Sequence, residues 1–314
     1  MSKPTVVIHT SDAQLVSARV GAHSLKSRSK SPDLFDVRLL RLEGTPHLYK
    51  RHNQRFFWWG DAPSVWRRRD SLAFAPLRRM VPALLGFQGR ALLLDPDIFA
   101  IGDVYELLTR DMHGKRIFCR QKSEWRDGRQ LYSSAVMLLE CSRLTHWQWE
   151  RDIDEIFRGT IKLGPWLSLL DEPTEHIGLL EDEWNHCDTL TEQTKLLHNT
   201  EIHTQPWKTG LPADYHDHAP RWPAPVERCR RLARRMLSAD GGRPIVYRPH
   251  PDQRQERLFF SLLKECLDAG GITRRFLRQA MRRNHLRKDA LTLLDGVPDR
   301  SLRSCLESPS TPWR

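Results

Sequence analysis

The sequence predicts an α/β fold in which helices flank a mostly parallel sheet, followed by a basic helical extension. Three observations carry this prediction: short apolar runs alternate with helix-like segments, one such run stops at two aspartates, and the excess positive charge lies in the last third of the chain. Strands that alternate with helices are typical of parallel sheets. With 314 residues, the chain is long enough to bury a large core without disulfide bonds.

The N-terminal segment has the pattern of a strand, a loop and a helix. Residues 5–9 form an apolar run that predicts a buried strand, and residues 16–25 place apolar side chains at helical spacing. Residues 37–42 predict a second strand, and residues 77–85 predict a helix after an irregular segment rich in Trp and Arg.

The next strand is the most informative part of the chain. Residues 90–94 predict a buried strand, with an arginine followed by four apolar residues, and Asp103 and Glu106 then have the Asp-x-x-Glu spacing that starts a helix. Residues 134–139 predict another buried strand, and residues 147–157 predict a charged amphipathic helix.

The character of the chain changes near residue 214, where a segment rich in His, Pro and Trp leads into Arg-rich helical segments. Residues 221–314 carry 21 Lys and Arg against 10 Asp and Glu, whereas residues 1–220 carry 29 of each, so the extension holds the whole net charge of +11. We therefore expect a catalytic domain over residues 1–214 and a basic, mainly helical extension over residues 215–314.

Composition also indicates where the protein works. The six cysteines are scattered without a Cys-x-x-Cys pair, which favours reduced thiols and the cytoplasm. The apolar stretch at residues 6–8 is too short for a signal peptide, and no run approaches the roughly 18 apolar residues of a membrane span. The expected location is cytoplasmic, with at most peripheral contact with the inner face of a membrane.

Asp95-Pro96-Asp97 carries the chemistry. Two carboxylates just past the end of a parallel strand lie where open α/β sheets bind ligands. Carboxylates that leave coordination positions open suit a divalent cation, and Pro96 stiffens the turn between them. Because Asp-x-Asp also ends many ordinary strands, the motif gains its meaning only from its neighbours.

Those neighbours resemble the family 8 glycosyltransferases, which are retaining enzymes of the GT-A fold. Residues 90–107, which contain Asp95 and Asp97 as the Asp-x-Asp (DxD) motif, look like the family's metal-binding strand and following helix, and residues 6–12 look like its nucleotide-binding first strand. Residues 132–138 and 183–207 are similar to the segments that contact the donor sugar and close the site. The resemblance covers residues 5–210, with its motifs in the family's order.

On this resemblance, His9, Thr10 and Ser11 would lie along the uridine of a UDP-sugar. Ser133 would contact the donor sugar, although it stands where the family has an asparagine.

The resemblance also implies the metal ligands and the catalytic residues. Asp95, Asp97 and His198 would bind Mn²⁺ or Mg²⁺, with Asp95 also part of the donor site. Arg78 would approach the diphosphate, so Asp97 and Arg78 are the expected catalytic residues. Gln205 occupies the donor-binding position at which the family has a phosphate-facing lysine.

The implied activity is transfer of a hexose from a UDP-sugar to a saccharide or lipid-linked acceptor, in the assembly of bacterial surface polysaccharide. Two departures leave an alternative open. Gln205 replaces the lysine, and Gly164-Pro165 stands where many members have an Asp-Gln pair. The alternative is a catalytically degenerate domain that binds a membrane or nucleic acid through its basic extension. A phosphatase of the haloacid dehalogenase type is disfavoured because its aspartates belong on the first strand.

Residues 272–294 of the extension predict one basic amphipathic helix. Its apolar stripe would either lie on an anionic membrane surface or pack on the main domain. We do not expect nucleic acid as a partner, nor a zinc site at His216 and His218, which lack a cysteine partner nearby.

Overall fold

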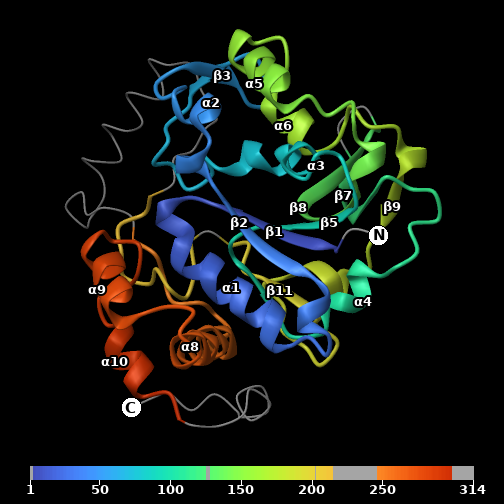
Figure 1. Ribbon diagram of the computed structural model, residues 1–314. Coiled ribbons are helices and arrows are strands. Elements are labelled where there is room, and N and C mark those ends of the chain that lie inside the picture. The colour runs from blue at the N-terminus through green and yellow to red at the C-terminus, as the bar shows by residue number, and fades with distance from the viewer. Residues whose placement is uncertain (1–2, 125–127, 202, 215–245, 299–314) are drawn as a thin grey trace.

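A six-stranded sheet forms the centre of the computed structural model, which describes residues 3–298 except 125–127, 202 and 215–245 (Figure 1). The strand order is β2-β1-β5-β8-β7-β9, and only β8 runs antiparallel to its neighbours. The strands are β1 (Thr5–Thr10), β2 (Asp36–Arg41), β5 (Arg90–Leu94), β7 (Ile117–Glu124), β8 (Gln130–Glu140) and β9 (Ile177–Leu179). The predicted α/β fold with a mostly parallel sheet is confirmed.

Helices cover both faces of this sheet (Figure 1). Val6 and Ile8 of β1 face the side of α1 (Leu15–Ser27) and α4 (Val104–Leu108). Val7, between them, faces the opposite core. That second face is covered by three helices, α3 (Val81–Leu84), α5 (Trp149–Arg158) and α6 (Leu163–Leu167). Because both faces are buried, the central strands consist mainly of apolar residues, as the sequence predicts.

A second, three-stranded sheet begins directly after the two aspartates. Its order is β10 (His186–Cys187), β11 (Leu196–His198) and β6 (Ile98–Ala100). Pro96 has no N–H to donate, so the ladder of β5 stops there and the chain enters β6 in the other sheet. A small hairpin of β3 (Arg55–Phe57) and β4 (Pro63–Val65) and the short helix α2 (Pro46–Tyr49) lie on the side of α5.

Three helices form the described part of the extension: α8 (Gln253–Asp268), α9 (Arg274–Arg282) and α10 (Ala290–Asp295). The expected continuous helix at residues 272–294 is therefore two helices, because Asn284 takes a positive φ of 59° after α9. Leu277 and Leu286 of the apolar stripe are fully buried in a core shared with α8 and α1. Of the two alternatives for the stripe, the structure shows packing within the protein.

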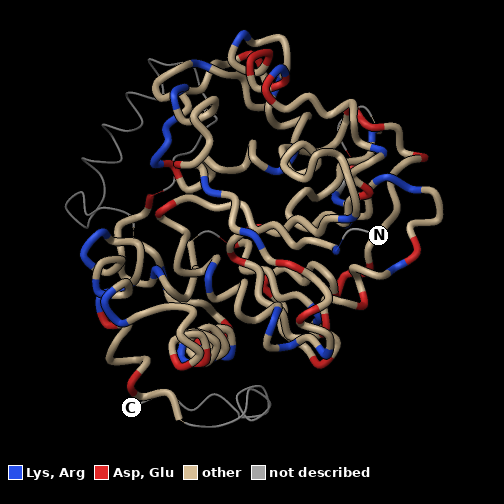
Figure 2. The backbone as a smooth tube through the Cα atoms, viewed as in Figure 1, with Lys and Arg blue, Asp and Glu red and all other residues tan. Residues whose placement is uncertain are grey.

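The arginines of α9 are exposed. Figure 2 marks their positions in blue along the backbone tube. No helix in the described part of the chain combines the length and apolar character needed to cross a bilayer. Cys119, Cys141, Cys187 and Cys266 carry free thiols, as predicted, and the other two cysteines lie outside the described residues.

We expect Gly21→Ala to destabilise the protein, because a Cβ there would lie 2.7 Å from the backbone oxygen of Ile98 in β6. Since α1 would have to move away from the small sheet, the free energy of unfolding should fall by about 2 kcal/mol in urea titrations. Gly44→Ala is the control, because nothing lies within 4 Å of its Cβ. Equal effects of the two substitutions would contradict the close packing of α1 on β6.

Candidate metal centre and adjoining cavity

The turn that carries the two aspartates is tied to both sheets. The backbone N–H of Asp95 donates to the carbonyl oxygen of Ala135 in β8 at 3.0 Å. The carbonyl oxygen of Asp97 accepts from the N–H of Asn199, just after β11, also at 3.0 Å. Both carboxylates are therefore held at the carboxyl end of β5, where the two sheets meet.

His198, at the end of β11, completes a group of three residues whose ligand atoms lie within 4.8 Å of one another. Among the described residues, Asp95, Asp97 and His198 form the one such group, which we call the metal group. Asp97 Oδ1 is buried, lacks a hydrogen-bond donor and lies 3.4 Å from His198 Nε2. Two carboxylates and an imidazole are ligands that suit a divalent cation such as Mn²⁺ or Mg²⁺, and Asp97 Oδ1 has no hydrogen-bond donor that a cation would have to displace.

The orientation of His198 is fixed by a neighbour. Its Nδ1 lies 2.8 Å from Asn185 Oδ1, which can only accept, so Nδ1 donates and Nε2 is directed toward Asp97. Burial disfavours the imidazolium, but the negative charge of the nearby Asp97 outweighs burial and raises the pKa of His198 to about 10. Asn185 also donates to Ser133 Oγ at 3.3 Å, which links the predicted sugar-binding serine to the metal group.

Arg78 forms a bidentate ion pair with Asp95. It extends from a 3₁₀ helix (Ala75–Met80), and its Nε donates to Asp95 Oδ1 at 3.0 Å while Nη2 donates to Oδ2. Its remaining nitrogen, Nη1, donates to Ser134 Oγ at 3.0 Å. Burial raises the pKa of Asp95, and the Arg78 guanidinium opposes this rise. Arg78 thus helps to keep a buried carboxylate ionised, while its predicted contact with a diphosphate stays a prediction.

His9 and Thr10, at the end of β1, are fully buried. His9 Nδ1 donates to the carbonyl oxygen of Leu94 at 3.1 Å, and Nε2 lies 3.2 Å from Asp95 Oδ1 without a hydrogen bond. Burial and the charge of Arg78 lower the pKa of His9, so the neutral imidazole presents a lone pair to this carboxylate. Both residues lie behind the site, whereas Ser11 lines an open cavity.

Gln205 contacts the second aspartate. Its Nε2 donates to Asp97 Oδ2 at 3.2 Å, and its Oε1 accepts from Gln14 Nε2 at 3.5 Å. Of the predicted site residues, the structure therefore brings Arg78, Gln205 and His9 onto the metal group and connects Ser133 to it through Asn185.

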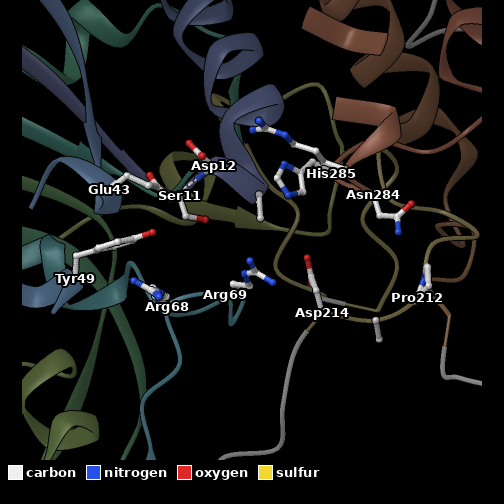
Figure 3. Close-up of a pocket in the computed structure, with 13 residues that line it drawn as sticks. Ser11, Asp12, Glu43, Tyr49, Arg68, Arg69, Pro212, Asp214, Asn284 and His285 are labelled. Atoms are coloured by element: carbon white, nitrogen blue, oxygen red, sulfur yellow. Dashed lines mark hydrogen bonds between the residues drawn. The ribbon is translucent and has the colours of Figure 1, made fainter. Parts of the chain in front are cut away.

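A cavity of about 630 Å³ adjoins the site and is drawn in Figure 3. It lies between the end of β1, the segment with Arg68 and Arg69, and the turn after α9 with Asn284 and His285. The charged side chains of its walls are Arg68, Arg69, Arg283, Asp12, Glu43 and Asp214. A small cavity of about 30 Å³ lies against the metal group, and its lining includes Asp95, Asp97, Gln205 and Tyr247. The hydroxyl of Tyr247 donates to Asp214, which lines the large cavity.

The position that lacks the family's Asp-Gln pair is closed by packing. The N–H of Gly164 in α6 donates to the carbonyl oxygen of Trp58 at 2.8 Å. A Cβ at Gly164 would lie 2.5 Å from the indole of Trp59. Because the indole occupies this space, no carboxylate or amide side chain fits at Gly164.

The structure adds residues that the sequence did not indicate as a site. Ser134 holds Arg78, and Gln14 holds Gln205. No local pattern marks either residue, because their partners lie 56 and 191 positions away in sequence. Asn185 lies in a segment that resembles the family, but its contact with His198 depends on the pairing of β10 with β11.

Comparison with known proteins gives distant likenesses. Neither a protein-family model nor a curated protein sequence matches the chain. Among solved structures, the WbbM bifunctional glycosyltransferase is 12% identical, with a TM-score of 0.46 over 66% of this chain and 47% of that one. The galactosyltransferase LgtC is 12% identical, with a TM-score of 0.46 over 71% and 94%. GlyE of Streptococcus pneumoniae TIGR4 is 16% identical, with a TM-score of 0.44 over 67% and 58%.

The chain thus spans less than half the length of the WbbM protein and somewhat more than half of GlyE. Likenesses at this level establish neither a family nor an activity for the chain, so its function is argued below from its own residues.

Replacement of Asn185 by alanine should weaken Mn²⁺ binding about 10- to 100-fold, because His198 loses the acceptor that orients its ring. Calorimetric titration of the folded variant measures the change. Asn199→Ala is a matched control, since Asn199 is equally buried but donates to Gln255 instead. Equal losses in the two variants would mean that Asn185 acts through general packing alone.

Metal binding should release a proton near neutral pH. Because the pKa of His198 is raised to about 10, the imidazolium is the metal-free form at pH 7, and a metal ion must displace its Nε2 proton. Mn²⁺ affinity should therefore rise about tenfold per pH unit between pH 7 and 9. Titrations in two buffers of different ionisation enthalpy count the protons. An affinity that stays constant over this range would exclude His198 as a protonated ligand.

Proposed function

We propose that the protein is a metal-dependent retaining glycosyltransferase that moves a hexose from a UDP-sugar to a saccharide or lipid-linked acceptor. The observation that carries the proposal is the convergence of Asp95, Asp97 and His198 beside a cavity of about 630 Å³. Cavities of several hundred Å³ are typical of sites for small organic ligands. A divalent cation at the end of such a cavity suits a ligand with a diphosphate, whose oxygens fill the open coordination positions.

The proposed donor lies across the carboxyl ends of the parallel strands, as ligands do in open α/β sheets. Its nucleoside occupies the large cavity, where Ser11 and Asp12 form one wall and Arg69 forms another. Its diphosphate extends past the small cavity toward Asp97. On this placement His9 and Thr10 support the nucleotide site from behind, since both are fully buried.

The residues that would hold the metal are Asp95, Asp97 and His198. A divalent cation bound there would stabilise the negative charge of the departing UDP. Arg78 forms an ion pair with Asp95, Asn185 directs His198, and Gln205 donates to the second carboxylate oxygen of Asp97. These contacts fix the donor atoms before a ligand arrives, so little reorganisation is needed when charge develops.

Retention of configuration follows from the family resemblance. On this proposal, the acceptor hydroxyl attacks the anomeric carbon from the face that the phosphate leaves, and a departing phosphate oxygen accepts its proton. The bond to the phosphate breaks as the new glycosidic bond forms. A dedicated protein base is not needed, and the packing of Gly164 against Trp59 is compatible with this. Ser133, joined to the metal group through Asn185, is placed to contact the donor sugar.

For a lipid-linked acceptor, we propose peripheral contact with the inner face of a bacterial membrane. The exposed arginines of α9 would meet anionic headgroups electrostatically, because its apolar stripe is already buried in the protein. This contact would place a cytoplasmic enzyme of surface-polysaccharide assembly next to its acceptor.

The alternative of a catalytically degenerate binding module rests on Gln205 and Gly164. Gln205 donates an uncharged amide to Asp97, and the packed Gly164 leaves no polar group at its position. A module of this kind would bind a membrane or nucleic acid through its basic extension and would not turn over a UDP-sugar, so an activity assay separates the two functions.

We expect slow release of UDP from UDP-glucose or UDP-galactose that depends on added Mn²⁺. Asp97→Ala and His198→Ala should reduce this release about 100-fold or more, because each removes a ligand of the stabilising cation. His47→Ala and Asp154→Ala are matched controls, since these residues form a histidine–aspartate pair of 2.8 Å outside the site. Both controls should retain the activity of the unmodified protein.

The outcomes separate the proposals. No binding of any UDP-sugar with any divalent cation would refute the glycosyltransferase. Binding with no UDP release, with or without an added oligosaccharide acceptor, would favour the degenerate module.

A further inference from the structure

Lys208 is a fully buried cation between the two cavities. Its Nζ donates to Asp214 Oδ2 at 2.5 Å and lies 3.5 Å from the hydroxyl of Tyr247. Asp214 lines the large cavity, and Tyr247 lines the small cavity next to the metal group. The ammonium therefore lies at the boundary between the proposed nucleoside site and the two aspartates.

The backbone fixes this position. The N–H of Lys208 donates to the carbonyl oxygen of Gln205 at 2.9 Å, so the two residues are joined by one tight turn. The Gln205 side chain donates to Asp97, and the Lys208 side chain donates to Asp214. The chain thus places an amide where the family resemblance implies a lysine, and a lysine one turn later.

Lys208 and the titratable groups around it affect one another's pKa. Burial lowers the pKa of Lys208, while Asp214 and, more weakly, Asp97 favour its charged form. His285, on the wall of the large cavity, has a pKa lowered by burial and next by the charge of Lys208. Since a buried ammonium is costly without a close anion, Asp214 serves as its counter-ion in the ligand-free protein.

Asp214 would not be left without a partner if Lys208 moved to another anion. Its other carboxylate oxygen accepts from the hydroxyl of Tyr247. The backbone carbonyl oxygen of Asp214 also accepts from the N–H of Ser71 at 3.2 Å, which anchors the backbone at Asp214. An exchange of the lysine between Asp214 and a ligand anion therefore leaves the surrounding contacts in place.

We propose that Lys208 binds a phosphate oxygen of the donor diphosphate and supplies the positive charge that Gln205 lacks. This inference rests on the proposed glycosyltransferase function. The diphosphate connects a nucleoside in the large cavity with a cation at Asp97, so it must pass the boundary at which Lys208 lies. On donor binding the ammonium exchanges Asp214 for phosphate, and Asp214 acts as its resting counter-ion.

The test compares UDP with uridine in calorimetric titrations without metal, so that only contacts of the chain with phosphate separate the two ligands. The double substitution Lys208→Met with Asp214→Asn removes the cation without leaving an unpaired carboxylate. It should lower the ratio of UDP affinity to uridine affinity about 10- to 100-fold, the range for loss of a charge-assisted hydrogen bond.

Asp214→Asn alone is the discriminating variant, and it keeps the test decisive if the lysine variants do not fold. It should leave UDP binding unchanged or tighten it, because the lysine loses its competing carboxylate. A loss of UDP affinity similar to that of the double variant would show that the ion pair is only structural. An unchanged ratio of UDP to uridine affinity in the double variant would also overturn the role of Lys208.

Failure of the underlying proposal is visible separately. If the unmodified protein binds no UDP even with Mn²⁺, the donor site itself is refuted, and the role of Lys208 with it.

Discussion

The pairing of β6 with β11 is the constraint on which the metal group depends. Ile98 lies opposite His198 in this antiparallel pair, and the N–H of Asn199 closes the ladder on the carbonyl of Asp97. Two segments about one hundred residues apart thereby place a carboxylate and an imidazole next to each other. A slip of one residue in this register would turn the His198 side chain to the opposite face of the small sheet. The apolar residues Phe99 and Leu197 on these strands hold the register, since both are fully buried in the core formed with α8.

Two largely buried ion pairs, Arg78–Asp95 and Lys208–Asp214, lie at the site. Arg78 balances Asp95, and Lys208 balances Asp214, so the ligand-free protein buries no isolated charge at these positions. Both pairs flank the path that a diphosphate would take between the large cavity and Asp97. Each arginine or lysine is therefore held in place before a ligand arrives, and the cost of ordering its long side chain falls on folding rather than on binding.

The sequence predicted the parts of the molecule that depend on local pattern. The strands at residues 5–9, 37–42 and 90–94 and the pair of aspartates follow from apolar runs and their end points. The family resemblance added His198, which no local pattern connects to Asp97 across one hundred residues. The large cavity could not be predicted, because its walls come from five separate segments of the chain. The break after α9 was missed because Asn284, which like glycine readily takes the left-handed φ that ends a helix, was not treated as an end signal inside the apolar stripe.

The basic extension shares its core with the small sheet that carries His198. Trp207 and Phe259 contact Phe99 at ring distances of 5.7 and 5.6 Å, and α8 also packs against α1. The change in charge near residue 214 therefore does not mark a point at which the chain divides cleanly. A fragment that ends there would expose the apolar side of the strands behind the metal group and would be prone to aggregate. In evolution, the extension is accordingly a poor candidate for exchange between proteins, because a replacement would have to reproduce the surface that supports the metal ligands.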